Sequence, residues 1–206
     1  MKYVDLTYAI VDNMPVFPGD PPMSLKQVAS IKERGYTDHQ LTTAMHVGTH
    51  IDAPLHMIEG GARIDEIAAD RFIGSGILID ARGKEMIDES FLYGKTLTHD
   101  SVVLICTGTD KKYRTPLYDT QYPTITESFA QKLADAKVKI LGIDFINPDK
   151  DDSFPIHKIL LSRQVLIIEN LTNIDSLIGV NSFDVIAFPM KLHAEAAPVR
   201  VVAMVK

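Results

Sequence analysis

Six short, continuous apolar runs are the feature of this sequence that most restricts its fold. Each run has four to seven residues and is rich in β-branched side chains, a pattern typical of strands covered on both faces of a sheet. Segments with helical spacing lie between some of them, so we expect an α/β fold with a mixed central sheet. The runs are residues 76–80, 101–106, 138–144, 165–169, 185–188 and 199–205.

The N-terminal part of the chain has a different pattern. Residues 4–10 alternate between polar and apolar, and residues 25–31 and 41–45 are further strand-like runs, so we expect a β-rich, antiparallel N-terminal part. The proline-rich stretch 15–22 predicts a rigid, extended loop, because proline removes backbone donors and restricts the residue before it. Phe17 on this loop either lines a pocket or belongs to a plain connector.

Two helices are predicted. Residues 124–137 carry apolar side chains at helical spacing, and Thr124 with Glu127 has the pattern of a capping box. A second helix is predicted over residues 156–163. The chain has 206 residues and contains no repeat, low-complexity tract or linker, so we expect a single domain over residues 1–206.

Composition excludes several classes of protein. The 21 Lys and Arg residues are outnumbered by 27 Asp and Glu residues, and no basic stripe offsets the net charge of −6, which argues against nucleic-acid binding. The single cysteine, Cys106, cannot form an intrachain disulfide, and at the end of an apolar strand it is interpreted as structural. No apolar run approaches the about 18 to 20 residues of a membrane span. These features predict a cytoplasmic protein without a membrane partner.

The segment HVGTHIDAPLHM contains the residues that indicate chemistry. It places His46, His50, Asp52 and His56 within eleven positions, with a glycine and a proline among them, so we expect a strand that ends in a shaped loop and presents these side chains together. Imidazoles and one carboxylate form a ligand set that leaves coordination positions open, which is typical of a catalytic metal site. Three of the chain's 7 histidines lie in this window, so chance clustering is the weaker interpretation.

The same segment resembles the H-x-G-T-H-x-D-A-P-x-H signature of the metal-dependent cyclase family, which includes bacterial kynurenine formamidases and isatin hydrolase. The resemblance covers nearly the whole chain and implies a single-domain swivelling β/β/α fold, together with a homodimer or homotetramer that acts on a small-molecule substrate. Further segments resemble family elements in the family's order: FPGD (17–20), GID (142–144), FPIHKILL (154–161), IIENLTNID (167–175) and APVR (197–200).

Carried over by position, the resemblance implies a divalent metal at His46, His50 and Asp52, with Asp52 bridging to a second metal at His157 and Glu169. Taken alone, His157 could be a buried, hydrogen-bonded residue, and Glu169 could cap a helix or pair with a cation. We expect one or two ions per chain. Zinc is expected ahead of manganese, although nitrogen and oxygen ligands bind several first-row metals.

The resemblance assigns His56 the role of a catalytic histidine. An imidazole titrates near neutrality, so it can take a proton from the attacking water and return one to the leaving group. The implied reaction is hydrolysis of an amide, formamide or lactam C–N bond, with arylformamidase (kynurenine formamidase) as the nearest named activity. The departures from the family, namely Phe17 in place of Trp and Ala196 with Ala197 in place of Gly-Ser, affect substrate choice.

Three other functions remain open from the sequence. The same site could support a metal-dependent cyclase or dehydratase acting on a small carbonyl substrate. It could also belong to a metal-binding protein without turnover. Two His and one carboxylate are also the ligands of non-haem iron oxygenases, but His157 and Glu169 argue against that class. Asp144, at the end of an apolar run, either supports a ligand from behind or caps the next turn.

Overall fold

A nine-stranded mixed sheet forms the centre of the computed structural model, which describes residues 1–206. Four neighbouring strands run parallel: β5 (Ile73–Asp80), β7 (Ser101–Cys106), β9 (Ile140–Ile143) and β10 (Leu166–Glu169). Antiparallel strands extend the sheet on one side with β11 (Phe183–Ile186), β13 (Val202–Val205) and β1 (Lys2–Asp5), and on the other with β4 (His50–Asp52) and β12 (Ala196–Pro198). The predicted α/β fold with a mixed sheet is confirmed.

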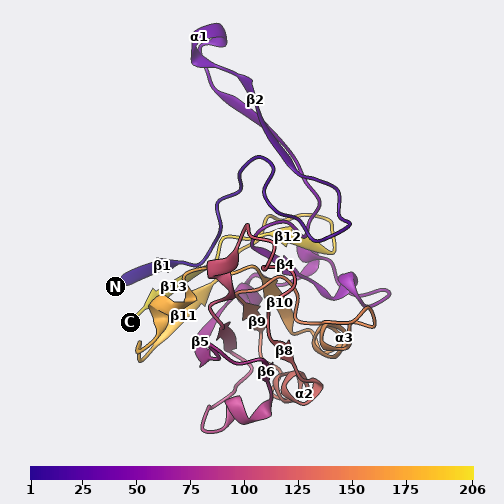
Figure 1. The fold of residues 1–206 in the computed structure, drawn as a ribbon, viewed down its shortest axis with the longest axis vertical. Coiled ribbons are helices and arrows are strands. Elements are labelled where there is room, and N and C mark those ends of the chain that lie inside the picture. The colour runs from indigo at the N-terminus through magenta and orange to yellow at the C-terminus, as the bar shows by residue number, and fades with distance from the viewer.

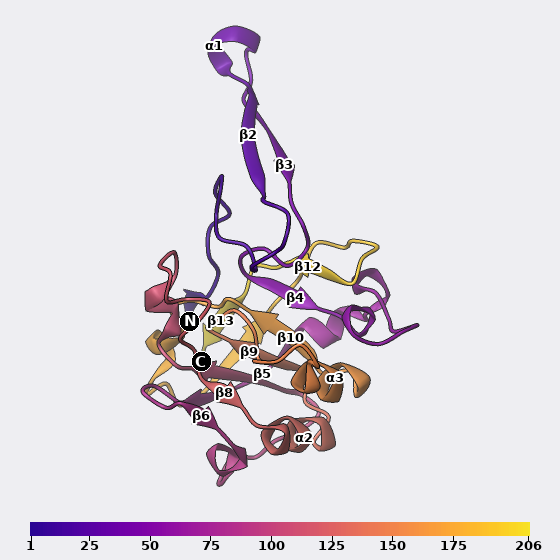
Figure 2. The same cartoon turned by 45° about the vertical axis from the view of Figure 1, so that its right-hand side comes forward.

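The core consists of two apolar layers on opposite faces of this sheet. All six residues of β7 are buried, as expected for a strand covered on both sides. Helices α2 (Glu127–Asp135) and α3 (Pro155–Ser162) lie side by side on one face (Figure 2). Their apolar side chains, including Phe129 and Leu160, pack against the sheet residues of that layer. None of the helices has both the length and the apolar character that a membrane crossing requires.

The remaining elements are short. Two small sheets pair β2 (Ser24–Ala29) with β3 (Asp38–Thr42) and β6 (Met86–Ile87) with β8 (Thr124–Ile125), and α1 (Ile31–Arg34) joins β2 to β3. Single 3-10 turns occupy Pro54–His56, Ile64–Glu66, Ala69–Phe72, Glu89–Leu92, Thr109–Lys112 and Ile174–Leu177.

The predicted start of the first helix was wrong. The helix begins at Glu127, and its N-cap is Thr126, whose hydroxyl accepts a hydrogen bond from the Phe129 backbone N–H at 3.2 Å. Residues 124 and 125 instead form β8, which pairs in parallel with β6. The capping pattern read at Thr124 was therefore displaced by two residues. The second helix, predicted over residues 156–163, is confirmed to within one residue.

The N-terminal antiparallel strands form a protruding arm. Strands β2 and β3 pair with each other, and with α1 they extend well away from the body of the molecule (Figures 1 and 2). Every residue of β3 is exposed, and α1 buries none of its residues. The antiparallel pairing is as predicted, but the run predicted over 41–45 is displaced to Asp38–Thr42, and neither strand contributes to the central core. The run predicted over 4–10 is also displaced: its strand is β1 (Lys2–Asp5), which joins the central sheet beside β13.

Asp144 anchors the loop that follows β7. Its carboxylate accepts hydrogen bonds from the backbone N–H groups of Thr107 (2.9 Å) and Gly108 (2.8 Å) and from the Thr107 hydroxyl (2.6 Å). Neither sequence interpretation describes this contact, because the turn that Asp144 caps lies 36 to 37 residues before it in the chain and is not the next turn. Nearby, Cys106 is buried, and burial raises the pKa of its thiol to about 12. A thiol of such high pKa is a poor nucleophile, which agrees with a structural role.

The carboxyl group of Asp144 gives a testable pH dependence. Burial raises its pKa from 3.8 to about 6, although the hydrogen bonds from Thr107 and Gly108 oppose the shift. An acid whose pKa is higher in the folded state stabilises the fold fully below its unfolded pKa, and that stability is lost as the pH rises through the folded pKa. Relative to Asp144→Asn, the wild type is expected to lose on the order of 2 to 3 kcal/mol between about pH 4 and pH 6. Urea unfolding of both proteins across this range measures the difference.

The exposed Asp70 provides the control for this experiment, because no hydrogen bond or ion pair involves its side chain. The Asp70→Asn variant should follow the wild type at every pH. A free-energy difference between wild type and Asp144→Asn that does not change with pH would contradict the proposed titration.

Candidate metal centre and active site

Strand β4 positions the central part of the histidine-rich segment. It lies between β10 and β12, and both neighbours run antiparallel to it. In this register His50 is opposite Glu169 of β10. Because alternate residues of a strand point to the same face of the sheet, the side chains of His50 and Asp52 project to the same side. The sequence predicted a strand that ends in a shaped loop. The strand does end in the turn Pro54–His56, but it starts later than expected, because His46 lies in the loop before it.

Gly48 shapes that loop. Its backbone has φ +62°, in the left-handed region, and a Cβ atom built there would lie 2.7 Å from Cε of Met14. The positive φ therefore favours glycine at this position, whereas the Met14 methyl is the end of a flexible side chain that can move away. The Gly48 carbonyl oxygen lies 2.9 Å from Nδ1 of His50, so the same residue also orients the neighbouring imidazole.

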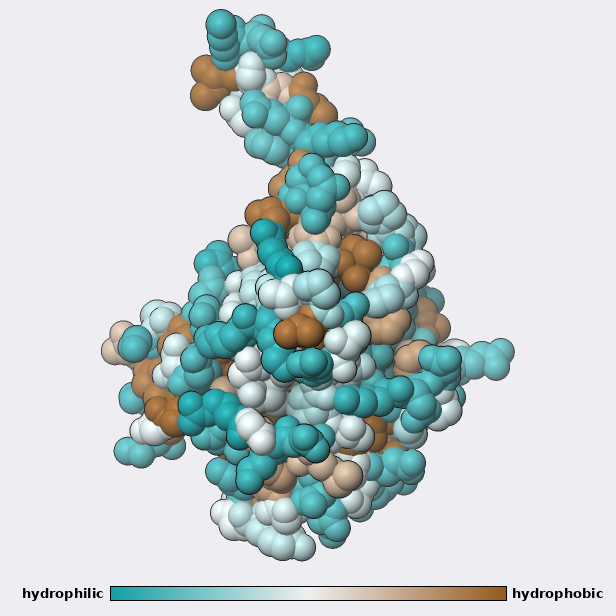
Figure 3. Space-filling model, in the orientation of Figure 1, coloured by the Kyte–Doolittle hydropathy of each residue, from teal (hydrophilic) through white to brown (hydrophobic).

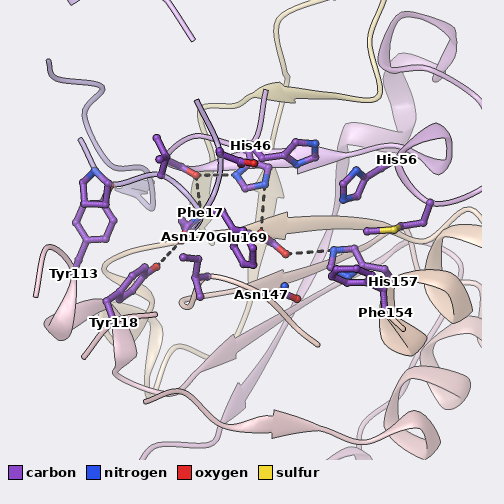
Figure 4. A pocket seen from close by; sticks show the side chains of 17 residues that line it. Phe17, His46, His56, Tyr113, Tyr118, Asn147, Phe154, His157, Glu169 and Asn170 are labelled. Carbon is purple, nitrogen blue, oxygen red and sulfur yellow. Dashed lines mark hydrogen bonds and ion pairs between the residues drawn. The ribbon is translucent and has the colours of Figure 1, made fainter. Parts of the chain in front are cut away.

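Five side chains lie close together at one side of a pocket, and Figure 4 labels three of them, His46, His157 and Glu169. The Asp52 carboxylate is at the centre: Oδ1 lies 3.0 Å from His46 Nδ1 and 3.6 Å from His50 Nε2, and Oδ2 lies 3.7 Å from His157 Nε2. Glu169 closes the other side: its Oε2 lies 3.4 Å from His50 Nε2, and its Oε1 lies 3.4 Å from His157 Nε2. The structure thus brings together all five residues for which the sequence analysis predicts metal ligation.

These residues fit a divalent metal ion. Both Asp52 carboxylate oxygens and His50 Nε2 are buried without any hydrogen-bond partner. Buried polar atoms are rarely left unpaired, because their desolvation is not compensated, and a cation would satisfy all three. Ligand atoms about 2.0 to 2.2 Å from a tetrahedral zinc ion lie about 3.3 to 3.6 Å apart, close to the separations seen here.

The histidine tautomers agree with metal ligation. The Gly48 carbonyl can only accept, so Nδ1 of His50 carries the proton and Nε2 presents its lone pair toward the cluster. Asp149 acts in the same way on His157, whose Nδ1 lies 2.7 Å from Asp149 Oδ2. Asp149 also accepts hydrogen bonds from the backbone N–H groups of Ile156 (2.7 Å) and His157 (3.0 Å), so one carboxylate caps α3 and orients its imidazole.

The charges of the cluster balance through protonation when no metal is bound. Burial alone lowers the pKa of His50, but the carboxylates of Asp52 and Glu169 outweigh this effect and raise it to about 9. Burial opposes ionisation of Asp52 and Glu169, but the surrounding imidazoles outweigh it. They hold the pKa of Asp52 well below its ordinary value and also lower the pKa of Glu169. A metal ion must therefore displace protons from the imidazoles in order to bind.

His56 lies at the edge of the cluster. Its ring packs against His46, with centroids 4.2 Å apart, and against His157 at 5.4 Å. Burial lowers the pKa of His56, an effect that Asp52 partly opposes, and no hydrogen bond engages either of its ring nitrogens. The imidazole is therefore neutral near pH 7 with a free lone pair.

The cluster contains two overlapping groups of potential ligands. Ligand atoms of His46, Asp52 and His56 lie within 4.8 Å of one another, as do those of His50, Asp52 and Glu169. Asp52 belongs to both groups, which is the arrangement expected of a bridging carboxylate. The family resemblance implies a different division, with His46, His50 and Asp52 at one metal and Asp52, His157 and Glu169 at the other. That division stays a prediction.

Several pocket residues were missed by the sequence analysis. Asn170 has φ +58°; its amide Nδ2 donates to the Gly48 carbonyl at 3.0 Å, and its Oδ1 accepts from the Tyr118 hydroxyl at 2.6 Å. Asn147 lines the same pocket. Glu195, from the loop before β12, lies 3.5 Å from His46 Nε2. Asn170 lies in the IIENLTNID segment and Glu195 shortly before APVR, but the sequence analysis gave neither residue a role.

The walls of the pocket are mainly aromatic and aliphatic. Phe17 on the proline-rich loop lines the pocket, so the structure agrees with that interpretation rather than with a plain connector. Tyr113 stacks on Tyr8 at a centroid distance of 3.8 Å and meets Tyr118 edge to face at 5.1 Å. Phe17, Tyr113, Tyr118 and Phe154 line a cavity of about 240 Å³ beside the histidine cluster. The arrangement suits a small, flat, largely apolar molecule with one polar group at the floor.

Comparison with known proteins defines the family. Residues 4–150 match the family model described as cyclase. Kynurenine formamidases from Delftia acidovorans and Paracidovorax citrulli are 31% and 33% identical to this chain over 202 and 205 residues, covering 96% of it and 95% and 94% of the respective relatives. The chain therefore belongs to the cyclase family.

Solved structures agree with this assignment. A protein described as a potential metal-dependent hydrolase with cyclase activity has a TM-score of 0.82 and 29% identity, with coverage of 100% of this chain and 98% of the other. Isatin hydrolase A from Labrenzia aggregata has a TM-score of 0.88 over 99% of this chain and 93% of its own, and its 24% identity supports the fold.

Proposed function

We propose that this protein is a metal-dependent hydrolase that cleaves the C–N bond of an amide, formamide or lactam, with arylformamidase (kynurenine formamidase) as the nearest named activity. One observation carries the proposal: a buried carboxylate without hydrogen-bond partners is ringed by three imidazoles at the floor of an aromatic pocket. The kynurenine formamidase relatives support the amide-hydrolase class over the full length of the chain.

In this proposal His46, His50, Asp52, His157 and Glu169 hold the metal, with Asp52 shared if two ions bind. A bound divalent cation supplies Lewis-acid chemistry, polarising the substrate carbonyl and acidifying water. Zinc is proposed ahead of manganese, because the donor set is imidazole and carboxylate and leaves room for an open coordination position.

His56 is proposed as the general base and acid. Its neutral imidazole takes a proton from the attacking water and then donates that proton to the departing nitrogen, so one residue serves both halves of the reaction. The lowered pKa of His56 supports this role, because the ring must be unprotonated before catalysis. The aromatic walls exclude bulk water and hold the acyl carbon over the cluster.

A cyclase or dehydratase using the same residues is the alternative chemistry. The relatives with named activities are hydrolases, so this alternative is not favoured. A metal-binding protein without turnover is also disfavoured, because every residue proposed for the reaction is present. Analysis of the product distinguishes the three: hydrolysis of an aryl formamide releases formate and an arylamine in equal amounts.

The direct test is hydrolysis of N-formylkynurenine, formanilide and isatin by purified protein of known metal content. We expect metal-dependent turnover of at least one of these, with formate or the ring-opened acid as product. No turnover of any of them by fully metal-loaded protein would contradict the proposed function.

We also propose that the protein is a homodimer or homotetramer, and the protruding arm supports this. An isolated two-stranded hairpin is at best marginally stable in water, yet β2 and β3 contact no other strand or helix extensively. The arm exposes the apolar side chains of Val28 (50%), Ile31 (71%), Tyr36 (53%) and Leu41 (40%). Figure 3 shows such apolar patches on the arm among polar residues. A second copy of the chain would cover them.

Polar substitutions on the arm test this assembly. A protein carrying Val28→Ser, Ile31→Ser and Leu41→Ser is expected to elute as a monomer of about 23 kDa, while the wild type elutes at two or four times that mass. Light scattering coupled to size-exclusion chromatography measures the mass. Met86→Ser removes an exposed apolar side chain elsewhere (57% exposed) and should leave the mass unchanged. A monomeric wild type would contradict the proposal.

A further inference from the structure

The Asn147 side chain has a hydrogen-bond donor that no group of the chain uses. Asn147 lies in the loop after β9, is only 8% exposed and lines the pocket. Its Oδ1 accepts a hydrogen bond from the Asp149 backbone N–H at 2.8 Å, which identifies the oxygen end of the amide and holds it in place. No acceptor in the chain engages the amide Nδ2. Because polar groups so nearly buried are rarely left unpaired, Nδ2 is available to a molecule in the cavity.

The free amide lies near the proposed metal ligands. Asp149, whose backbone N–H holds Asn147, also reaches His157, with its carboxylate 2.7 Å from Nδ1 of the ring. Asn147, His157 and Glu169 line the same cavity. Figure 4 shows the Asn147 amide beside Glu169 and His157. The free donor is therefore at the end of the cavity where the proposed hydrolysis takes place.

The other donors of the pocket are engaged or lie elsewhere. The Tyr118 hydroxyl donates to Asn170, and the Asn170 amide donates to a backbone carbonyl. The Tyr113 hydroxyl has no partner, but its oxygen is fully buried, and Figure 4 shows Tyr113 beyond Tyr118, away from the histidines. His50 must release the proton that faces the cluster when a metal binds. Asn147 is thus the neutral donor that remains free beside the cluster.

We infer that Asn147 is a catalytic residue of this protein. Its Nδ2 donates a hydrogen bond to the carbonyl oxygen of the scissile amide and stabilises the negative charge that develops on that oxygen. The inference rests on the proposed hydrolase function and adds to it a group that contacts the reacting atoms. The sequence analysis gave Asn147 no role, because its amide acquires a direction only through the hydrogen bond from Asp149.

A donor at this position acts on both steps of hydrolysis. When water adds to the carbonyl carbon, a C–O bond forms, the π electron pair moves to the carbonyl oxygen, and a proton of the water passes to His56. A preorganised amide N–H lowers this barrier, because its hydrogen bond strengthens as the oxygen becomes negative. The electron pair then returns to form the carbonyl, the C–N bond breaks, and the departing nitrogen receives the proton from His56. A carbonyl oxygen has two lone pairs, so this hydrogen bond is compatible with Lewis-acid polarisation of the same oxygen.

Two substitutions of Asn147 test this role. In Asn147→Asp the carboxylate still accepts from the Asp149 N–H but cannot donate, and Asn147→Ala removes both contacts without adding a charge. With formanilide, we expect kcat per bound metal to fall about 100-fold in each variant while KM changes less than about threefold, the pattern of an interaction made mainly in the transition state. Asn181→Asp makes the same chemical change at an exposed site outside the pocket and should keep the wild-type kcat. Elemental analysis and thermal unfolding show which variants contain metal and are folded.

Binding of an unreactive analogue provides a second readout. Methanesulfonanilide has a tetrahedral sulfur with two oxygens where formanilide has its carbonyl group. Titration calorimetry should show about fivefold to tenfold weaker binding of this analogue to both Asn147 variants than to the wild type and Asn181→Asp. Wild-type kcat in both folded variants, or unchanged affinity for the analogue, would overturn the inference. Absence of formanilide turnover in the metal-loaded wild type would instead contradict the hydrolase function, and the binding measurement would still test the donor.

Discussion

Replacing Asp52 with asparagine is expected to abolish metal binding at micromolar metal and to remove hydrolysis with it. The Asp52 carboxylate is within 3.7 Å of three imidazoles, and both of its oxygens lack any other partner. Removing a residue that hydrogen-bonds to a metal ligand typically lowers metal affinity by about 10-fold to 100-fold. Removing a ligand that two metals share should therefore lower metal affinity by at least about 100-fold. Elemental analysis after dialysis measures the metal, and an aryl formamide assay measures the activity.

The Asp70→Asn variant again provides the matched control, because it makes the same chemical change at an exposed site. It should keep the metal content and the rate of the wild type. Circular dichroism and thermal unfolding show whether Asp52→Asn is folded. A folded Asp52→Asn protein that retains its metal would contradict the ligand assignment.

The Asp149→Asn variant is expected to weaken metal binding by about 10-fold to 100-fold without touching a ligand. The Asp149 carboxylate accepts the Nδ1 proton of His157, which leaves the Nε2 lone pair facing the cluster. An amide placed there can donate to Nδ1, and the imidazole then carries its proton on Nε2, where it cannot bind a metal. Asparagine in place of the aspartate of a serine protease triad acts through the same change of tautomer.

Two measurements distinguish this effect from a general loss of structure. Nitrogen-15 chemical shifts of the His157 ring report which ring nitrogens carry protons. In the metal-free wild type both nitrogens should be protonated, because Asp149, Asp52 and Glu169 raise the pKa of His157, and in metal-free Asp149→Asn the proton should remain on Nε2 alone. The control is Asp151→Asn. Asp151 lies in the same loop, is exposed, and its side chain hydrogen-bonds only to Ser153, so this variant should preserve both the His157 tautomer and the metal affinity. An unchanged tautomer together with unchanged affinity would contradict the orienting role of Asp149.

The sequence predicted the core strands well because their burial is visible in the residues themselves. A strand such as β7, covered on both faces, must be apolar throughout, and the run 101–106 marks it to the residue. The start of α2 was misplaced because Thr124 and Thr126 are both suitable caps, and only the pairing of β8 with β6 selects the second. The arm was not foreseen, since alternation predicts strands but not what they pack against.

The candidate site was predictable to the extent that its residues are close in sequence. His46, His50, Asp52 and His56 fall in one window, and their residue types alone indicated a metal. The approach of His157 and Glu169 depends on the register of β10 with β4 and on the position of α3, so only the family resemblance suggested it.

The residues behind the ligands could not be given roles from the sequence. Asp149 is a carboxylate in a polar loop, and Asn170 is one of several asparagines outside helices and strands. Their roles arise from hydrogen bonds to His157 and Gly48 that only the folded chain makes. A sequence-based search for similar sites would need to include carboxylates shortly before a histidine-bearing helix.

The measurement that tests the central claim most directly is the activity of the protein as metal is removed and returned. The protein is stripped with a chelator, dialysed, and titrated with zinc or manganese while formate release from an aryl formamide is followed. The account predicts that the stripped protein is folded but inactive, and that activity returns in proportion to bound metal and saturates at one or two ions per chain. Undiminished hydrolysis by the stripped, metal-free protein would contradict it.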